Sequence, residues 1–488
     1  MSLTNQPEPA IALSTDEVKR RSVGGAVSYF GRTIFLLLLN MATMFVLSAK
    51  LETTEFGIFG IVTQFIGVLV FASDVGLAAA LIQKKDEPSR AELLTCFTVQ
   101  QVLSWIIVAF CLATIAFGFL SQKIGVEGNW ILFAMALSFP LAGLKTIPSI
   151  LLERKLEYSK LVIPQIVETI VFNAILIWFV FAGMGVIVYA YAIVARSIVG
   201  VLTMYLIKPW KPGFGFERST WHLFRFGAVF QLNDLLARFK DQFFYLALAY
   251  FIPLNQFGYI QWAKNWSMYP YNLTVQNVMA ITFPTFARIQ DNPPLLKRAI
   301  EKTLYFITLA IFPLLAGMVL FIRPLIELLP VYEKWLPAIL TLTLFCFSIG
   351  WGAISSPMTN VLTAIGKIRT TLKLMVMWTV LTWVITPVLV YFYGYEGVAW
   401  SAGLIALSSV IPIILVQRRI PFAFWDQIWR QLVGVGVMIV VAYLGRAQWG
   451  QSYVLFATGI LVAGAVYSLV TIALGPRKWY DEFKSLRS

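Results

Sequence analysis

Charged side chains lie inside the long apolar runs of this sequence. Placing a charge there costs free energy, so each of these residues is a functional candidate. The basic ones are Arg32, Lys145, Arg196, Arg225, Arg238, Lys240 and Lys264, and the acidic ones are Asp74, Glu168, Asp234 and Asp241. The basic residues outnumber the acidic ones, and a low dielectric strengthens every uncompensated charge. A cavity lined by this set would favour an anion, and guanidinium groups bind phosphate in a bidentate manner.

The basic residues differ in their expected depth. Lys145 and Arg225 fall near predicted helix ends, which favours the interpretation that they extend to the lipid headgroups. The deeper ones either line a cavity or are packed in salt bridges, and the sequence leaves both open: Arg32, Arg196, Arg238, Lys240 and Lys264.

The segment 223–251 holds the densest group of charges. Asp234, Arg238 and Asp241 are spaced i, i+4, i+7, which places them on one face of a helix. Such a face is predicted to contact protein or water rather than lipid. Two alternatives remain: an intrahelical ladder in which the acids neutralise Arg238, or an arginine shared between those acids and an anionic ligand.

Two further carboxylates, Asp74 and Glu168, lie inside predicted spans. Each either takes up a proton, because an apolar setting raises the pKa of a lone carboxyl group, or pairs with a neighbouring arginine. His222 is the only histidine, which excludes histidine-rich metal sites and histidine proton relays. The sequence lacks a phosphate-binding loop of the G-x-x-x-x-G-K-[ST] type, so we expect neither ATPase activity nor a cofactor.

The elements that position these residues are predicted to be transmembrane helices. Hydrophobic residues make up 59% of the 488 positions and charged residues 13%, with a mean hydropathy of +0.77. A span needs about 20 mainly apolar residues, and only a helical bundle satisfies the backbone in lipid here. This predicts an all-α polytopic membrane protein of about fourteen spans: 24–48, 56–82, 94–120, 129–150, 162–182, 185–207, 223–251, 255–281, 303–323, 335–363, 372–393, 395–417, 429–447 and 453–474.

The distribution of Lys and Arg tests this topology. With a cytoplasmic N-terminus, the cytoplasmic connections and tails hold 26 of these residues and the outer connections hold five. This asymmetry follows the positive-inside rule and predicts an inner-membrane protein with both termini in the cytoplasm. The net charge of +14 then reflects topology and contact with membrane lipids, and not nucleic-acid binding.

The chain also contains a weak internal repeat. Gly25-Ala26-Val27 precedes Glu55-Phe56-Gly57-Ile58-Phe59, and Gly227-Ala228-Val229 precedes Gln256-Phe257-Gly258-Tyr259-Ile260 at a similar offset. The repeat predicts two six-helix bundles, 1–212 and 213–420, followed by two extra helices and a tail in 421–488. In transporters built from repeats, the substrate site lies between the halves.

Several strings, in this order and spacing, resemble one known family. They are Glu55-Phe56-Gly57-Ile58-Phe59, Asp74-Val75-Gly76-Leu77 through Ile82-Gln83-Lys84, Leu151-Leu152-Glu153-Arg154-Lys155-Leu156-Glu157-Tyr158, the region from Asp241 to Phe257-Gly258-Tyr259, and Leu362-Thr363-Ala364-Ile365-Gly366-Lys367. With the helix count, they resemble the polysaccharide transporter family, the Wzx-type flippases of the multidrug/oligosaccharidyl-lipid/polysaccharide exporter superfamily.

This resemblance implies a V-shaped pair of six-helix bundles around a central cavity, with two trailing helices. It implies alternating-access export of undecaprenyl-pyrophosphate-linked oligosaccharide to the periplasmic leaflet, for exopolysaccharide, capsule or O-antigen synthesis. A polysaccharide polymerase and a chain-length regulator would be further partners. Related lipid II flippases use arginines in the first helix, where Arg32 stands. The resulting hypothesis is that Arg32, Arg238 and Lys240 or Lys264 hold the headgroup while Arg196 lines the cavity.

Two other classes of protein compete with a flippase. An ion-coupled multidrug or small-molecule antiporter of the same superfamily would favour an acidic cavity, whereas this interior is net basic. An integral-membrane enzyme needs a sizeable loop to hold paired catalytic groups. The outer connections are short, and the acids expected there resemble no such site: Glu52, Glu55, Glu127, Glu327, Glu333 and Glu396. We therefore do not expect an enzyme.

Overall fold

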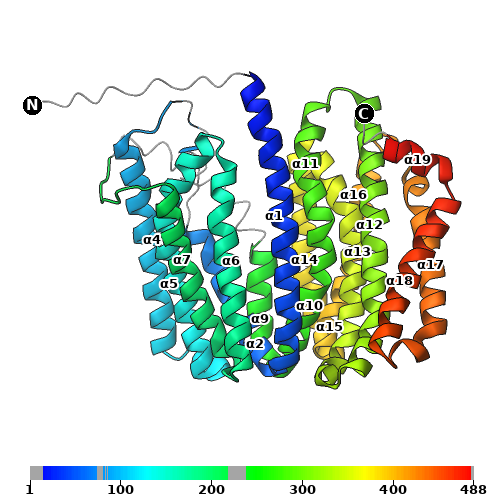
Figure 1. Ribbon diagram of the computed structural model, residues 1–488, viewed down its shortest axis with the longest axis horizontal. Helices are drawn as coiled ribbons and strands as arrows, with labels where there is room; N and C mark the ends of the chain where they lie inside the picture. Colours follow the sequence, from blue (N-terminus) through cyan, green and yellow to red (C-terminus); the bar gives the residue numbers. More distant parts are fainter. Residues whose placement is uncertain (1–14, 74–80, 83, 85, 218–237, 485–488) are drawn as a thin grey trace, which may run out of the picture.

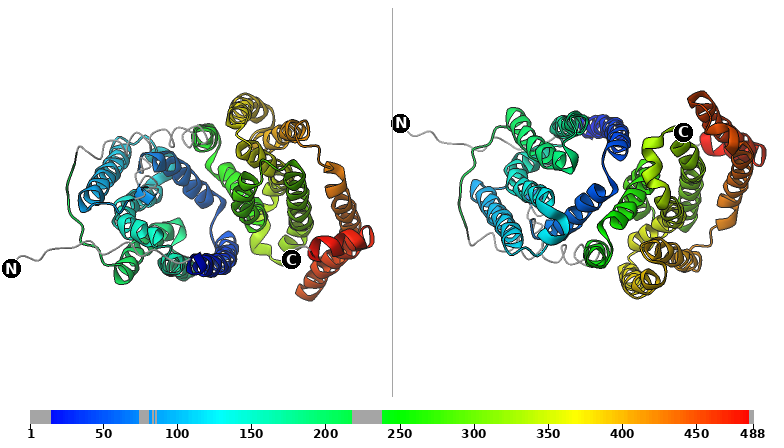
Figure 2. Two further views of the ribbon diagram at one scale, coloured as in Figure 1. Left: turned by 90° about the horizontal axis from the view of Figure 1, so that it is seen from above. Right: turned by 90° about the horizontal axis from the view of Figure 1, so that it is seen from below.

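The computed structural model describes residues 15–73, 81, 82, 84, 86–217 and 238–484, and within these ranges it is helical, without strands. The first group of helices packs together as one bundle (Figures 1 and 2). It consists of α1 (Thr15–Lys50), α2 (Thr53–Ser73), α4 (Arg90–Ala116), α5 (Ser121–Arg154), α6 (Tyr158–Phe181), the short η1 (Gly185–Ile187) and α7 (Val188–Ile207).

The second group forms a bundle beside the first, and a last pair of helices packs on its outer side against α12 (Figure 2). The second bundle consists of η3 (Phe239–Phe243), α9 (Phe244–Phe251), α10 (Leu254–Leu273), α11 (Val275–Arg288), α12 (Pro293–Leu328), η4 (Pro330–Ala338), α13 (Ile339–Ala364), α14 (Ile368–Tyr393), α15 (Glu396–Leu407) and α16 (Val410–Gln417). The last pair is α17 (Phe424–Trp449) and α18 (Tyr453–Ala473), followed by the short α19 (Pro476–Lys484).

Twelve helical segments of the described chain are long and apolar enough to cross a membrane. They overlap twelve of the predicted spans and confirm an all-α polytopic membrane protein. The predicted span 223–251 lies partly outside the described residues, and 255–281 corresponds to α10 and α11, neither of which is among these twelve segments. The count of fourteen and the proposed boundaries at 212 and 420 therefore remain predictions.

Local sequence explains where several helices begin. Ser89 caps α4 in a reciprocal capping box with Glu92, which satisfies two backbone donors at the helix start. Asn292 caps α12, whose first residue is Pro293, the position where proline is best tolerated. Between α14 and α15, Gly394 adopts a positive φ of 61°, a conformation that favours glycine.

Two breaks interrupt segments that the sequence predicts to be continuous. A π-helical turn, η3, precedes α9 and carries Lys240 and Asp241. Thr274 separates α10 from α11, one turn after Pro270, which lacks a backbone donor. Both breaks change which side chains share a face, so Arg238 and Asp241 are not separated by the regular α-helical turn that the prediction assumes.

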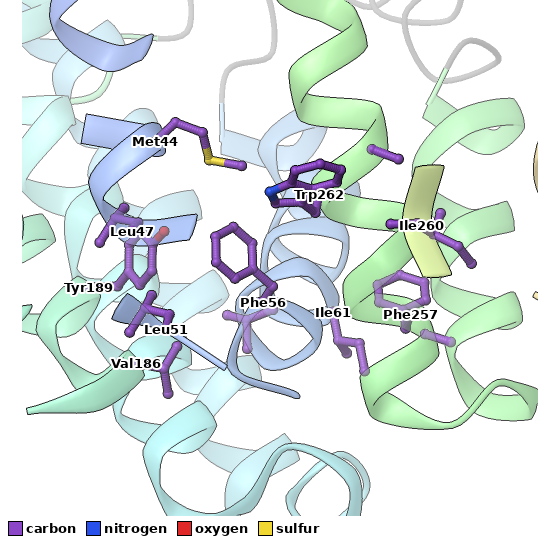
Figure 3. Close-up of a cluster of buried hydrophobic side chains, with 14 of the residues drawn as sticks. Met44, Leu47, Leu51, Phe56, Ile61, Val186, Tyr189, Phe257, Ile260 and Trp262 are labelled. Carbon is purple, nitrogen blue, oxygen red and sulfur yellow. The ribbon is translucent and has the colours of Figure 1, made fainter. Parts of the chain in front are cut away.

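The two bundles meet closely at the end of the molecule opposite α19. A large apolar cluster spans both bundles there (Figure 3). Gly57 of α2 and Gly258 of α10 allow the helices to approach: a Cβ on Gly57 would lie 2.2 Å from the Leu254 carbonyl oxygen, and one on Gly258 would lie 1.8 Å from the Thr53 carbonyl oxygen. These glycines occupy equivalent positions in the predicted repeat, so the repeat places matching residues at the bundle interface.

Candidate functional site

Glu168 of α6 is the centre of a buried charge cluster in the first bundle. Lys145 Nζ of α5 lies 2.5 Å from its Oε1 atom, and Arg196 Nε of α7 lies 3.7 Å from its Oε2 atom. The Glu168 side chain is 9% exposed and that of Lys145 20%, whereas that of Arg196 is 48% exposed. The carboxylate therefore neutralises the part-buried lysine, while about half of the Arg196 side chain stays exposed.

The Lys145 contact corrects one sequence interpretation. Its side chain does not extend to the headgroups but pairs with Glu168. Burial of an unpaired ammonium is costly, and a carboxylate on the neighbouring helix provides the compensation. For Glu168 itself, the two alternatives were proton uptake and pairing with an arginine; the carboxylate is paired with both a lysine and an arginine.

Gly200 of α7 creates the space for this carboxylate. A Cβ at position 200 would lie 1.9 Å from Glu168 Oε1 and 2.4 Å from its Cδ. Helices α6 and α7 pack closely along their length, and the missing side chain lets the carboxylate lie against the α7 backbone. The sequence alone does not mark this glycine, because its role depends on a residue in another helix.

Arg32 of α1 lies one turn away along α6. Its Nη1 atom donates a hydrogen bond to Oε1 of Gln165, and Gln165 and Glu168 share a face because they are three residues apart. Asn40 and Asn173 join the same two helices by a 3.0 Å hydrogen bond. The structure thus brings Arg32 and Arg196 to neighbouring turns of α6.

The four charged side chains of this basic group, Arg32, Lys145, Glu168 and Arg196, carry a formal charge of +2 together. Two of the cations are guanidinium groups, and Arg196 additionally lies over the Phe172 ring with 5.4 Å between Cζ and the ring centroid. Guanidinium groups fixed in this way can donate paired hydrogen bonds to phosphate oxygens. The basic group is therefore suited to bind an anion.

Lys240, Asp241 and Lys264 form a second group in the other bundle. Lys240 Nζ lies 2.6 Å from Asp241 Oδ1, and Lys264 Nζ lies 3.7 Å from the centroid of the Tyr245 ring. All four residues line one cavity of about 400 Å³. The residues predicted to bind one headgroup are thus divided between two bundles.

Arg238 lies at the junction of the two bundles. Its Nη1 atom donates a 2.8 Å hydrogen bond to the carbonyl oxygen of Gly67 in α2. Asp241, one candidate partner in the predicted ladder, pairs with the adjacent Lys240. Asp74, Arg225 and Asp234 lie outside the described residues, so the predictions made for them are untested.

An aromatic closure, which the sequence analysis missed, seals the bundle interface near Gly57 and Gly258. Trp262 of α10 stacks on Trp335 of η4, and both indole groups donate hydrogen bonds to Ser48 of α1. Tyr332 donates to the Phe45 carbonyl oxygen at 2.5 Å. The signal available in the sequence was weak: tryptophans scattered through apolar runs are more often ordinary core residues.

Known proteins share both sequence and fold with this chain. The family described as "Polysaccharide biosynthesis protein" matches residues 46–340, more than half of the chain. The lipopolysaccharide biosynthesis protein WzxC of Escherichia coli (strain K12) is 25% identical over 373 residues, covering 73% of this chain and 72% of that protein.

Two groups of solved structures have the same fold. The lipid II flippase MurJ in an inward closed conformation superposes with a TM-score of 0.74 at 15% identity, covering 92% of this chain and 99% of MurJ. An inward-facing multidrug resistance transporter of the MATE family gives a TM-score of 0.62 at 15% identity, covering 81% of this chain and 98% of that structure. At such identities, the likeness shows the fold alone.

The helices are arranged as in both of these structures, and the second of them is described as a transporter of the MOP superfamily. The matched region confirms the resemblance seen in the sequence: the chain belongs to the polysaccharide transporter family of Wzx-type flippases.

Proposed function

We propose that this protein flips undecaprenyl-pyrophosphate-linked oligosaccharide from the cytoplasmic to the periplasmic leaflet by alternating access. The glycan is destined for exopolysaccharide, capsule or O-antigen. Family membership and the likeness to WzxC support this role. Transport of this kind makes and breaks no covalent bond. It requires only a binding site for the headgroup and a protein whose cytoplasmic and periplasmic ends open in turn.

The basic group of the first bundle is the observation that carries the proposal. Arg32 and Arg196 lie on neighbouring turns of α6, and Glu168 neutralises the more deeply buried Lys145. A pyrophosphate that entered would exchange water for two guanidinium groups in a low dielectric, where charge-assisted hydrogen bonds are strong. Gln165 orients Arg32 before the headgroup arrives.

The aromatic closure is the part of the structure that opens and closes during transport. It joins the bundles at the end opposite α19 (Figure 1). With both termini in the cytoplasm, as the Lys and Arg distribution predicts, this sealed end faces the periplasm. The headgroup then enters from the cytoplasmic side of the inner membrane and leaves once the closure separates. On the far side, a polymerase and a chain-length regulator would use the product.

The competing function is an ion-coupled multidrug antiporter, which the MATE-like fold alone would allow. Drugs of that kind are mostly cations, and a formal charge of +2 around Glu168 would repel them. The basic group therefore favours the lipid-linked anion over the antiporter substrate.

The test is complementation of a strain lacking this protein. We expect the deletion to lose surface polysaccharide and to accumulate the lipid-linked oligosaccharide, and Arg32→Ala and Arg196→Ala to fail to restore export. Arg446→Ala is the matched control, because Arg446 is exposed on α17, outside the first bundle, and its guanidinium group lies over the Tyr443 ring. With membrane expression confirmed by immunoblot, wild-type export in both bundle variants would remove the basic group from the site. If the deletion strain resists cationic dyes as well as wild type does, this result would argue against the antiporter.

A further inference from the structure

Two lysines form hydrogen bonds between the bundles at the end opposite α19 (Figure 1). Lys123, at the start of α5 in the first bundle, donates from Nζ to the carbonyl oxygen of Tyr250 in α9 at 3.3 Å. Lys334, on η4 of the second bundle, donates from Nζ to the carbonyl oxygen of Ala49 in α1 at 3.1 Å. Each bundle therefore supplies one donor and one acceptor.

The two acceptors occupy equivalent positions in the internal repeat. Ala49 is the last residue but one of α1, and Tyr250 is the last residue but one of α9. They are as far apart along the sequence as Gly57 and Gly258, the two glycines that meet at the bundle interface. The repeat therefore relates the two carbonyl groups in the same way as it relates the two glycines.

The two donors also lie in matching places of the bundles. Lys123 lies in the connection from α4 to α5, and Lys334 lies in the connection from α12 to α13. Lys123 is on a helical turn that Gly125, with a positive φ of 68°, separates from the rest of α5. Similarly, η4 is a short helical segment before α13. The residues that follow the lysines, Ile124 and Trp335, are almost completely buried, which fixes the backbone that carries each donor.

Each lysine binds the carboxyl end of a helix in the opposite bundle. The last carbonyl groups of a helix have no amide partners within it. Lysine side chains donate to such groups and interact favourably with the negative end of the helix dipole. Lys334 also lies 3.8 Å from Oε1 of Glu52, but the Glu52 side chain is 70% exposed, so water and salt screen this ion pair. The hydrogen bond to the helix end is the contact that both lysines share.

The aromatic closure accompanies only one of these two contacts. Trp335 follows Lys334 in the chain and donates to the carbonyl oxygen of Ser48, the residue before Ala49. The position equivalent to Ser48 in the repeat is Ala249, whose side chain offers no acceptor. The lysine contact is thus the part of the closed end that the repeat duplicates.

We propose that Lys123 and Lys334 form a reciprocal pair of latches, both of which must release before this end of the protein opens. In an interface with two-fold symmetry every contact occurs twice, so the bundles cannot separate here while either hydrogen bond remains. The proposal rests on the proposed function for the direction of opening, which is toward the periplasm. It adds the residues that set how readily the closed end opens.

The test measures how readily the closed end admits a small reagent. The reporter is Met44→Cys, beside the aromatic closure (Figure 3), in a background without the native cysteines. A membrane-impermeant maleimide is added outside intact cells. Lys123→Met and Lys334→Met keep an apolar stem and remove the donor. We expect each to raise the labelling rate about threefold, the net effect of losing one partly exposed hydrogen bond. The double variant should raise it about tenfold, because contacts without shared partners act additively.

Lys50→Met is the matched control for the lysine variants. Lys50 follows Ala49 at the end of α1, but its ammonium lies over the Phe181 ring of its own bundle, 4.8 Å from the ring centroid. Its loss should leave the labelling rate unchanged. Glu52→Gln should change the rate by less than about twofold, because exposed ion pairs are weak and the Ala49 contact remains.

A second measurement separates the latches from a general loosening of the fold. In inside-out vesicles, which expose the cytoplasmic side, Lys123→Met and Lys334→Met should label no faster than wild type. Faster labelling from both sides, a wild-type rate from outside in either variant, or an equal rise in Lys50→Met would overturn the latches. Wild-type export by Arg32→Ala and Arg196→Ala would instead contradict the headgroup site and leave the labelling result standing.

Discussion

Trp262 and Trp335 stack with 4.8 Å between their ring centroids and 7° between their planes, and both donate to Ser48. Nε1 of Trp262 bonds to Ser48 Oγ at 3.0 Å, and Nε1 of Trp335 bonds to the Ser48 carbonyl oxygen at 2.8 Å. Both indoles are fully buried. One residue of α1 thus holds two elements of the second bundle, so the bundles cannot part at this end without breaking both bonds.

The closure should be sensitive to loss of either tryptophan. We predict that Trp335→Ala opens this end, because truncating a buried aromatic costs about 3–5 kcal/mol. The reporter is Met44→Cys, whose native side chain points toward Trp262 (Figure 3), in a background lacking the buried Cys96, Cys111 and Cys346. A membrane-impermeant maleimide added outside the cell should label this cysteine several-fold faster in Trp335→Ala. Equal rates would show that the aromatic pair is not the barrier.

The close contact between α2 and α10 should not tolerate a larger residue in place of its glycines. Gly258→Ala places a Cβ 1.8 Å from the Thr53 carbonyl oxygen, and overpacking of this kind costs about 1–3 kcal/mol. We predict a lower melting temperature and reduced export. Gly436→Ala is the matched control, since a Cβ there meets nothing within 4 Å. A melting temperature of Gly258→Ala that equals that of the control would contradict the close packing.

The buried pair in the first bundle leads to a third prediction. Glu168→Ala leaves Lys145 without its carboxylate, and breaking a buried pair in this way costs about 3–5 kcal/mol. Gly200→Ala should have a smaller effect of the same sign, because the new methyl group displaces the carboxylate. Thermal unfolding in detergent measures both variants. The double variant Lys145→Met/Glu168→Leu should recover most of the lost stability; if it does not, the two residues do not act as a pair.

The sequence predicts the helices well because the signal for a transmembrane helix lies within the helix's own residues. A run of about twenty apolar residues between polar connections can be recognised as a span without information about the other helices. The excess of Lys and Arg on one side of the membrane adds a second local signal. The segment 255–281 is the exception that shows the limit: α10 contains Gln261, Lys264 and Asn265, so its membrane position depends on polar partners in other helices.

The site is predicted less completely because its contacts are tertiary. Position within a span marks Arg32, Arg196 and Glu168 as candidates, but their grouping depends on how α1, α6 and α7 are rotated about their axes. Lys145 is misinterpreted for the same reason, since its partner lies 23 residues away on another helix. The π-turn at η3 changes the register that the spacing of Arg238 and Asp241 assumes.

The most direct test of the account is a leaflet assay in proteoliposomes. A fluorescent polyprenyl-pyrophosphate-linked glycan is incorporated in both leaflets, and the fraction that an impermeant quencher reaches is followed with time. Purified wild type and Arg446→Ala should expose the inner pool at the same rate, and Arg32→Ala/Arg196→Ala should slow exposure at least tenfold, because each guanidinium–phosphate contact is worth about 1.5–3 kcal/mol. Exposure at the wild-type rate by the double variant, with equal amounts of folded protein, would contradict a pyrophosphate site at the basic group.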